Sequence, residues 1–315
     1  MSVLFERIAF IGLGHIGSSL CHAIKRGKIA NHIAGYARSA KTRETALRIG
    51  LVDSIHDTAA GAVANADLVF LCVPVGVCGE VVAEMASALK PGALLTDVGS
   101  VKAAIVRDVL VHLPKGVDFV PGHPVAGTEQ SGPESGFAEL FHNRWCILTP
   151  LPDSNPDAVS RLEKFWQACG ANVELMTPEH HDLVLAITSH LPHLIAYNTV
   201  ATAADLEEVT NSEVIKYSAG GFRDLPASLH LTLQCGAMYF STTAKRFWKC
   251  SEDSRKICRR CSGLSVGAMV KRSSICSHGR GKFGAASSAP DRKRLHPILA
   301  VTRRPANRSV RYRSA

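Results

Sequence analysis

Ile8–Gly17, which reads Ile-Ala-Phe-Ile-Gly-Leu-Gly-His-Ile-Gly, is the most informative part of the chain for its architecture. A short apolar run meets three glycines spaced as G-x-G-x-x-G, and Ser18–Ile24 then has a helical pattern. Between a strand and a helix, such glycines allow a tight turn and let the backbone approach a pyrophosphate, whose oxygens bind amides of the helix N-terminus. The pattern therefore predicts a Rossmann-type dinucleotide site. Its predicted contacts are Gly12, Gly14, Ile16 and Gly17.

Apolar runs and helical patterns alternate along the chain as far as residue 176. The expected strands lie at residues 8–11, 33–37, 66–75, 93–97, 118–120, 145–149 and 172–176, with helices through 81–89 and 159–168. This alternation predicts an α/β, doubly wound sheet that binds ligands at the carboxyl ends of its strands. Pro74, near the end of the third run, is a further expected cofactor contact.

The end of the second strand bears on the choice of cofactor. A site selective for NAD usually places Asp or Glu there to bind the ribose 2′-hydroxyl, whereas this chain has Ala37 followed by Arg38 and Ser39. An arginine at this place can pair with a 2′-phosphate, which favours NADP. The alternative is a solvated arginine in a loop, so NAD(P) is the expectation.

A second informative stretch, Gly122–Glu129, reads Gly-His-Pro-Val-Ala-Gly-Thr-Glu. Pro124 restricts the preceding residue to extended geometry, so we expect His123 on a stiff loop. Ser100 and His123 both follow predicted strands, and this places them at the ligand-binding edge of the sheet. A turn that merely contains a histidine is the alternative.

From residue 177 the pattern becomes helical, which predicts a second, helical domain over residues 177–224 after a Rossmann domain over 1–176. His190 and His193 are three residues apart on one helix face, and Pro192 between them is expected to kink the helix. No carboxylate or cysteine cluster accompanies these histidines, so we predict no metal. For each histidine alone, a buried core position is the alternative.

Five motifs occur in an order that resembles the prephenate/arogenate (cyclohexadienyl) dehydrogenases of tyrosine biosynthesis. They are Gly12-x-Gly14-x-x-Gly17, Asp97–Lys102, Gly122–Gly127, Ser189–His193 and Gly220–Asp224. The resemblance covers roughly residues 6–224. It implies a Rossmann domain followed by an all-helical domain through which two subunits dimerise.

The resemblance also implies an activity and a set of site residues. The family transfers a hydride from the substrate ring to the nicotinamide of NAD(P) while a ring carboxylate leaves as CO2, which makes the ring aromatic. By position, His123 matches the catalytic histidine that bonds the ring hydroxyl, and Ser100 the serine that orients it. The matching substrate-binding residues are His190, His193, Arg223 and Glu129, the last near the pocket mouth.

The resemblance ends after Asp224, where the composition changes. Residues 225–315 hold 19 Lys and Arg against 3 Asp and Glu, although the whole chain has a net charge of +9. Leu225–Met238 can be written in codons that, with one T restored in front, read Phe-Thr-Arg-Ile-Ala-Ala-Ser-Asp-Pro-Thr-Met-Trp-Arg-Asp, as the family continues. We therefore interpret residues 225–315 as an out-of-frame, irregular tail that truncates the helical domain and impairs dimerisation and activity.

Two other functions fit parts of the sequence. One is another Rossmann hydroxyacid-type dehydrogenase, but its usual lysine base is replaced here by histidines. The other is a catalytically silent NAD(P)-binding protein whose basic tail binds nucleic acid; an out-of-frame tail argues against that partner. The chain has no apolar run of membrane-spanning length and no secretory signal pattern, so we expect a cytoplasmic enzyme with a small-molecule substrate.

Overall fold

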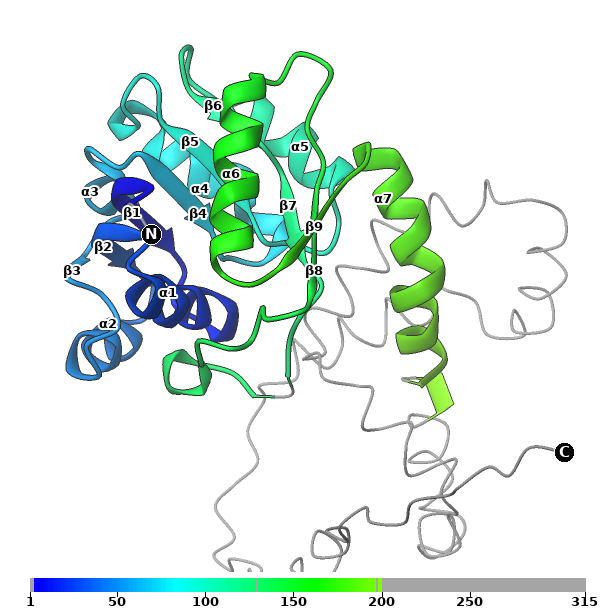
Figure 1. The fold of residues 1–315 in the computed structure, drawn as a ribbon, viewed down its shortest axis with the longest axis horizontal. Helices are drawn as coiled ribbons and strands as arrows, with labels where there is room; N and C mark the ends of the chain where they lie inside the picture. Colours follow the sequence, from blue (N-terminus) through cyan, green and yellow to red (C-terminus); the bar gives the residue numbers. More distant parts are fainter. Residues whose placement is uncertain (1–2, 129, 197, 200–315) are drawn as a thin grey trace, which may run out of the picture. The chain divides into compact units, whose positions relative to one another are not determined.

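The computed structural model describes residues 3–128, 130–196 and 198–199, shown as the coloured ribbon in Figure 1. A six-stranded parallel sheet has the order β3-β2-β1-β4-β5-β6, which confirms the doubly wound prediction. Because the chain runs outward from β1 and then returns to β4, a ligand-binding crevice is expected between the carboxyl ends of these two strands. The strands are β1 (Phe5–Ile11), β2 (Ala30–Tyr36), β3 (Ser54–His56), β4 (Leu68–Leu71), β5 (Leu94–Asp97) and β6 (Asp118–Phe119).

Helices cover both faces of this sheet. Along β1, Ile8 and Phe10 join one apolar cluster with α1 (His15–Gly27) and α6 (Pro156–Ala168). Ala9 and Ile11 point the other way, into a cluster with α3 (Ala59–Val63), α4 (Cys78–Met85) and α5 (Ala103–Leu110). Burial on both faces explains why these strands are continuous apolar runs. The remaining helical elements are α2 (Ala40–Arg48) and the short turns η1 (Val75–Val77), η2 (Ala86–Ala88) and η3 (Pro133–Ser135).

The later strands correct the sequence prediction. The strands expected at 145–149 and 172–176 do not extend the main sheet; β8 (Trp145–Leu148) and β9 (Asn172–Leu175) form a second sheet with β7 (Gly122–Pro124). Pro121 has no amide hydrogen to donate to a sheet, so β6 stops after two residues and the chain changes sheets. His123 consequently lies within strand β7, opposite Ile147, and not on the expected loop.

A helical segment follows the second sheet. The Thr177 side chain accepts a hydrogen bond from the backbone N–H of His180 and caps α7 (Pro178–Leu185), where the helical part was expected to begin. A π-helical stretch, Ala186–His190, comes next, and residues 191–196 are again helical. Pro192 therefore lies inside helical residues, and a wider turn precedes it where we expected a kink. The rest of the predicted helical domain and the tail lie outside the described residues.

Candidate active site

The glycine-rich loop has the geometry of a dinucleotide cradle. Gly12 has φ +108°, and a Cβ there would lie 2.3 Å from the carbonyl oxygen of Cys72. A Cβ on Gly17 would lie 2.4 Å from the oxygen of Gly12, so both positions admit only glycine. Gly14 differs, because a Cβ there would meet nothing within 4 Å, and it opens helix α1 without a side-chain cap. Open space above uncapped amides fits a bound pyrophosphate.

The other predicted cofactor residues lie around this loop. Ile16 is half-buried in α1, and Pro74 is exposed where β4 leads into η1. Arg38 and Ser39 are exposed after β2, and the Ser39 hydroxyl caps α2 by accepting a hydrogen bond from the amide of Thr42.

Two nearby aspartates are engaged elsewhere. Asp53 accepts a hydrogen bond from the amide of Ile33 and another from Lys25, and Asp57 pairs with Arg43. Among the described residues, no carboxylate follows β2 directly in the place that binds a ribose 2′-hydroxyl in NAD-selective sites.

A buried ion pair joins the two sheets beneath the site. Lys102 and Asp97 are fully buried, and the Lys102 ammonium donates to the Asp97 carboxylate and, at 2.6 Å, to the carbonyl oxygen of Gly122. The Asp97 carboxylate also accepts from the amides of Gly99 (2.8 Å) and Gly122 (3.3 Å). This pair fixes the loop that carries Ser100 against strand β7, which carries His123.

His123 is connected to helix α7. It is buried, with 8% of its surface exposed, and its Nδ1 lies 2.8 Å from Nε2 of the fully buried His181. Nδ1 of His181 lies 3.0 Å from Oδ1 of Asp182. The Asp182 carboxylate accepts hydrogen bonds from the backbone amides of Lys102 (2.7 Å) and Ala103 (3.0 Å), at the N-terminus of α5.

Burial controls the charge of these groups. Burial, followed by the nearby charges of Lys102, His181 and His190, holds the pKa of His123 well below the usual 6.5. Burial is also the main cause that lowers the pKa of His190 to about 4. For Asp182, burial acts to raise the pKa, but the hydrogen bonds from His181 and two backbone amides outweigh it and leave the pKa below its ordinary value. Near neutral pH, His123 is therefore a neutral imidazole and Asp182 a carboxylate.

Of the other predicted site residues, the structure describes Ser100, His190 and His193. His190 is buried, with 5% of its surface exposed. The Ser100 hydroxyl is buried and has no hydrogen-bond partner within the described part of the chain. His193 is half-buried. Glu129 and Arg223 lie outside the described residues.

Sequence reasoning missed four residues of this site. Asp97 and Lys102 were read only as parts of a motif, and His181 and Asp182 only as the start of a helix. A lysine in an otherwise apolar context after a strand is a weak signal for a buried pair. His123 and His181 are 58 residues apart, and no local pattern indicates that they meet.

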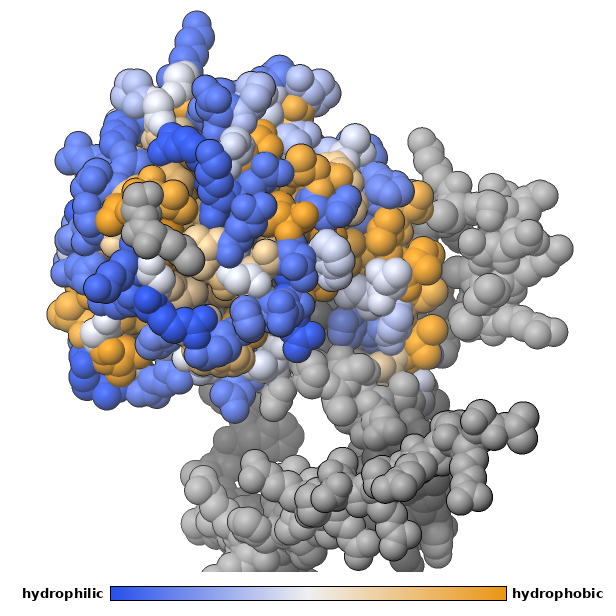
Figure 2. Space-filling view, viewed as in Figure 1, coloured by the Kyte–Doolittle hydropathy of each residue, from blue (hydrophilic) through white to orange (hydrophobic). Residues whose placement is uncertain are grey.

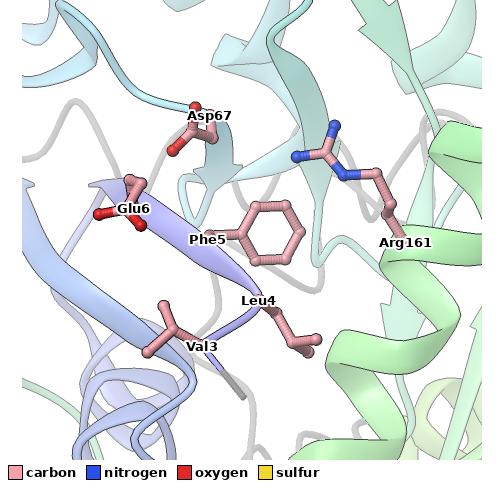
Figure 3. Close-up of a pocket in the computed structure, with 6 residues that line it drawn as sticks. All are labelled: Val3, Leu4, Phe5, Glu6, Asp67 and Arg161. Carbon is pink, nitrogen blue, oxygen red and sulfur yellow. The ribbon is translucent and has the colours of Figure 1, made fainter.

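A separate cavity lies away from this site, at the amino end of β1. Figure 3 shows a cavity of about 220 Å³ lined by Val3–Glu6, Asp67 and Arg161, at the amino end of β1 and thus at the opposite edge of the sheet. The Arg161 guanidinium lies 4.9 Å from the centre of the Phe5 ring, and Asp67 pairs with Lys90. The Asp67 carboxylate is therefore already paired, and the Arg161 guanidinium packs against an aromatic ring. Among the described residues, no three His, Cys, Asp or Glu side chains converge as metal ligands, and no helix is long and apolar enough to cross a membrane.

Comparisons with known proteins agree on one family. Residues 20–175 match the family model of the prephenate dehydrogenase nucleotide-binding domain, and residues 177–227 match that of the dimerization domain. A cyclohexadienyl dehydrogenase of Zymomonas mobilis is 43% identical over 221 residues, 70% of this chain and 75% of that protein. A prephenate dehydrogenase of Bacillus subtilis is 34% identical over 226 residues, 71% of this chain and 61% of that protein.

The structural comparison gives the same result. The crystal structure of prephenate dehydrogenase from A. aeolicus in complex with hydroxyphenyl propionate and NAD+ superposes with a TM-score of 0.74 at 28% identity. The match covers 88% of this chain and 98% of that one. An arogenate dehydrogenase structure from Synechocystis has a TM-score of 0.67 at 26% identity, covering 86% of this chain and 96% of that one.

Proposed function

Because this chain belongs to the prephenate dehydrogenase family, we propose that it catalyses the NAD(P)-dependent oxidative decarboxylation of prephenate or arogenate. Prephenate gives 4-hydroxyphenylpyruvate and arogenate gives tyrosine, so the reaction serves tyrosine biosynthesis. The proposal rests on the state of His123, which is a buried, neutral imidazole. His123 bonds to His181, and His181 bonds to the ionised Asp182. A neutral imidazole is the form that can accept a proton from a substrate hydroxyl.

In the proposed reaction, Gly12, Gly14 and Gly17 form the cradle for the dinucleotide. The bound NAD(P)+ supplies the acceptor for the hydride that leaves the hydroxyl-bearing ring carbon. His123 accepts the hydroxyl proton as this carbon is oxidised to a carbonyl. The ring carboxylate then departs as CO2, its bonding electrons make the ring aromatic, and the former carbonyl oxygen takes the proton back from His123. His123 therefore ends the reaction in the neutral form in which it began.

The remaining predicted site residues are assigned to the substrate. We assign the orientation of His123 and the substrate to Ser100, and contacts within the pocket to His190 and His193. We assign a substrate carboxylate to Arg223, because a planar guanidinium binds carboxylates in a bidentate manner. Glu129 is assigned to the mouth of the pocket. The two candidate substrates share the ring and its carboxylate and differ in a side-chain keto or amino group.

The proposed cofactor preference is NADP. Arg38 and Ser39 are exposed after β2, where an arginine can pair with a 2′-phosphate, and the nearby aspartates Asp53 and Asp57 are bound to other groups. An NAD-selective enzyme of the same family would need a different side chain at this place to bind the ribose 2′-hydroxyl.

The proposed assembly is a homodimer formed through the helical domain. Leu183 on α7 and Ile187 and Ile195 in the helical residues after it are about half-exposed, and Figure 2 shows apolar residues gathered over this helical segment. Exposed apolar patches of this kind mark protein interfaces. The proposed compartment is the cytoplasm, and no nucleic-acid partner is proposed.

The C-terminal part is proposed to be out of frame after about residue 224. The end of the family match at residue 227 supports this proposal, since residues 228–315 match neither family model. Sequencing the gene across codons 222–228 tests it directly. In-frame codons that cannot encode the family sequence in the alternative frame would contradict it.

The proposed function is tested with both substrates and both cofactors. Reduced nicotinamide is followed by absorbance, released CO2 is measured, and the product is identified, for this chain and for a frame-restored chain. We expect one CO2 for each cofactor reduced, with prephenate or arogenate as the substrate and a preference for NADP. Oxidation of simple hydroxyacids, or a frame-restored chain that binds cofactor but turns over neither substrate, would contradict the proposal.

A further inference from the structure

Two side chains connect the N-terminus of helix α5 to the proposed base, His123. The Asp182 carboxylate caps the N-terminus of α5, His181 bonds to Asp182, and His123 bonds to His181. We propose that His181 and Asp182 are positioning residues that fix the tautomer of His123, so that Nδ1 carries the hydrogen and Nε2 the lone pair. The inference rests on the proposed function for its catalytic meaning, but the tautomer itself is a property of the protein without substrate.

The order of donors and acceptors follows from the carboxylate. An ionised Asp182 can only accept hydrogen bonds, so Nδ1 of His181 must donate to it. In a neutral imidazole the second nitrogen is then an acceptor, so Nε2 of His181 accepts from Nδ1 of His123. Nε2 of His123 is left with the lone pair that a general base needs.

The reverse order requires an additional buried charge. If Nδ1 of His123 were the acceptor, His181 would have to carry hydrogens on both nitrogens and be cationic. His181 is fully buried, and the Lys102 ammonium already occupies the same interior, where Asp97 neutralises it. Burying another cation is costly, and Asp182 already accepts from two amides of α5. The neutral chain is therefore favoured.

The chain Asp182–His181–His123 also affects how well His123 holds the proton that it accepts from the substrate. When His123 becomes an imidazolium, several titratable groups surround it. Asp97 lies within β5 and Lys102 follows that strand. The others are His181 and Asp182 of α7 and His190 of the π-helical stretch. The Lys102 ammonium opposes the new charge, whereas His190, whose pKa is lowered to about 4, is neutral near pH 7. The Asp182 carboxylate, acting through His181, favours it and keeps the ring in one orientation.

The tautomer is measured without turnover. Long-range ¹H–¹⁵N spectra of the full chain, labelled in its histidine rings, distinguish which nitrogen carries the hydrogen, and the His123→Asn and His181→Gln variants assign the signals. We expect the Nδ1–H form for both His123 and His181 at mildly basic pH. The Nε2–H form for His123 would overturn the inference, whether or not the chain is active.

Two substitutions of His181 separate positioning from packing. His181→Phe keeps a ring of similar size but removes the acceptor, so we expect a mixture of His123 tautomers and a kcat lowered roughly 10- to 100-fold, with KM within about twofold. His181→Gln keeps an acceptor oxygen, so most of the rate and the Nδ1–H tautomer should be retained. His180→Gln, on the exposed neighbouring residue, is the matched control.

The results distinguish this inference from the proposed function. A frame-restored chain that is inactive but has the Nδ1–H tautomer at His123 contradicts the function and supports the inference. Active His181→Phe with unchanged kcat and tautomer overturns the inference and leaves the function standing. Where His181→Phe does not fold, the parent spectrum and the His181→Gln variant still decide.

Discussion

Because two histidines of the site are buried in neutral form, the folding stability of the protein depends on pH. The pKa of His190 is lowered by burial to about 4, whereas an unfolded histidine titrates near 6.5. Below 6.5 the unfolded chain binds a proton that the folded chain does not, so folding stability falls as the pH drops. His190 alone accounts for a loss of about 2 kcal/mol between about pH 7.5 and about pH 5. His123, His22 and His56 act in the same direction, since burial lowers their pKa values too.

Urea unfolding at these two pH values measures the effect. The midpoint should be clearly lower at the acidic pH, and His190→Gln should reduce the difference because glutamine does not titrate. Equal midpoints for the parent chain would show that the histidines are not buried in neutral form.

The glycines of the cofactor loop should respond differently to the same substitution. Gly14→Ala places a methyl group in open space at an ordinary φ of −86°, so the free energy of unfolding should change by less than about 1 kcal/mol. The methyl group occupies the space assigned to the pyrophosphate, so the cofactor Kd should rise about tenfold or more. Gly12→Ala clashes with the Cys72 carbonyl at φ +108° and should destabilise the fold by about 2–4 kcal/mol.

Thermal unfolding without cofactor and a fluorescence titration with cofactor separate the two effects. A Gly14→Ala protein that binds cofactor as tightly as the parent chain would remove this loop from the proposed site.

At the scale of elements, the Lys102–Asp97 pair joins the two sheets. Both partners are fully buried, so Lys102→Met leaves a buried carboxylate without its counter-ion and should lower the free energy of unfolding by about 3–5 kcal/mol. Lys90→Met is a comparison, because Lys90 also pairs with an aspartate, Asp67, but both side chains are partly exposed to solvent, so the loss should be smaller than for Lys102→Met. Chemical denaturation of both variants makes the comparison. Equal losses would show that the buried pair does not join the sheets as described.

The elements also show how far sequence reasoning reaches. β1, the glycine turn and α1 were predictable because each depends on local signals: an apolar run, glycine spacing and helical periodicity. The exchange of sheets at Pro121 was not, since the pairing of β7 with β8 depends on contacts between distant segments. For the same reason, the sequence did not identify His181 as a site residue. His123 was identified by its position beside Pro124 and by resemblance, whereas its partner is determined by how α7 packs against α5.

For the whole molecule, the two family-model matches and the described residues both lie in the first part of the chain. The dimerization-domain match ends at residue 227, and exposed apolar residues lie on α7 (Leu183) and on the helical residues after it (Ile187 and Ile195). We therefore expect a frame-restored chain to dimerise and the 315-residue chain to remain monomeric or to aggregate. Size-exclusion chromatography with light scattering measures this, and a stable dimer of the 315-residue chain would contradict the out-of-frame proposal.

If His123 is the base of an oxidative decarboxylase, its removal should stop turnover and leave cofactor binding intact. The rate of cofactor reduction with prephenate and arogenate is measured for a frame-restored chain and for its His123→Asn variant, with the exposed His112→Asn as control. The parent and control should release CO2 as they reduce cofactor, while His123→Asn should lose about 10²–10⁴-fold in kcat with unchanged cofactor affinity. A His123→Asn enzyme as fast as the parent would contradict the account.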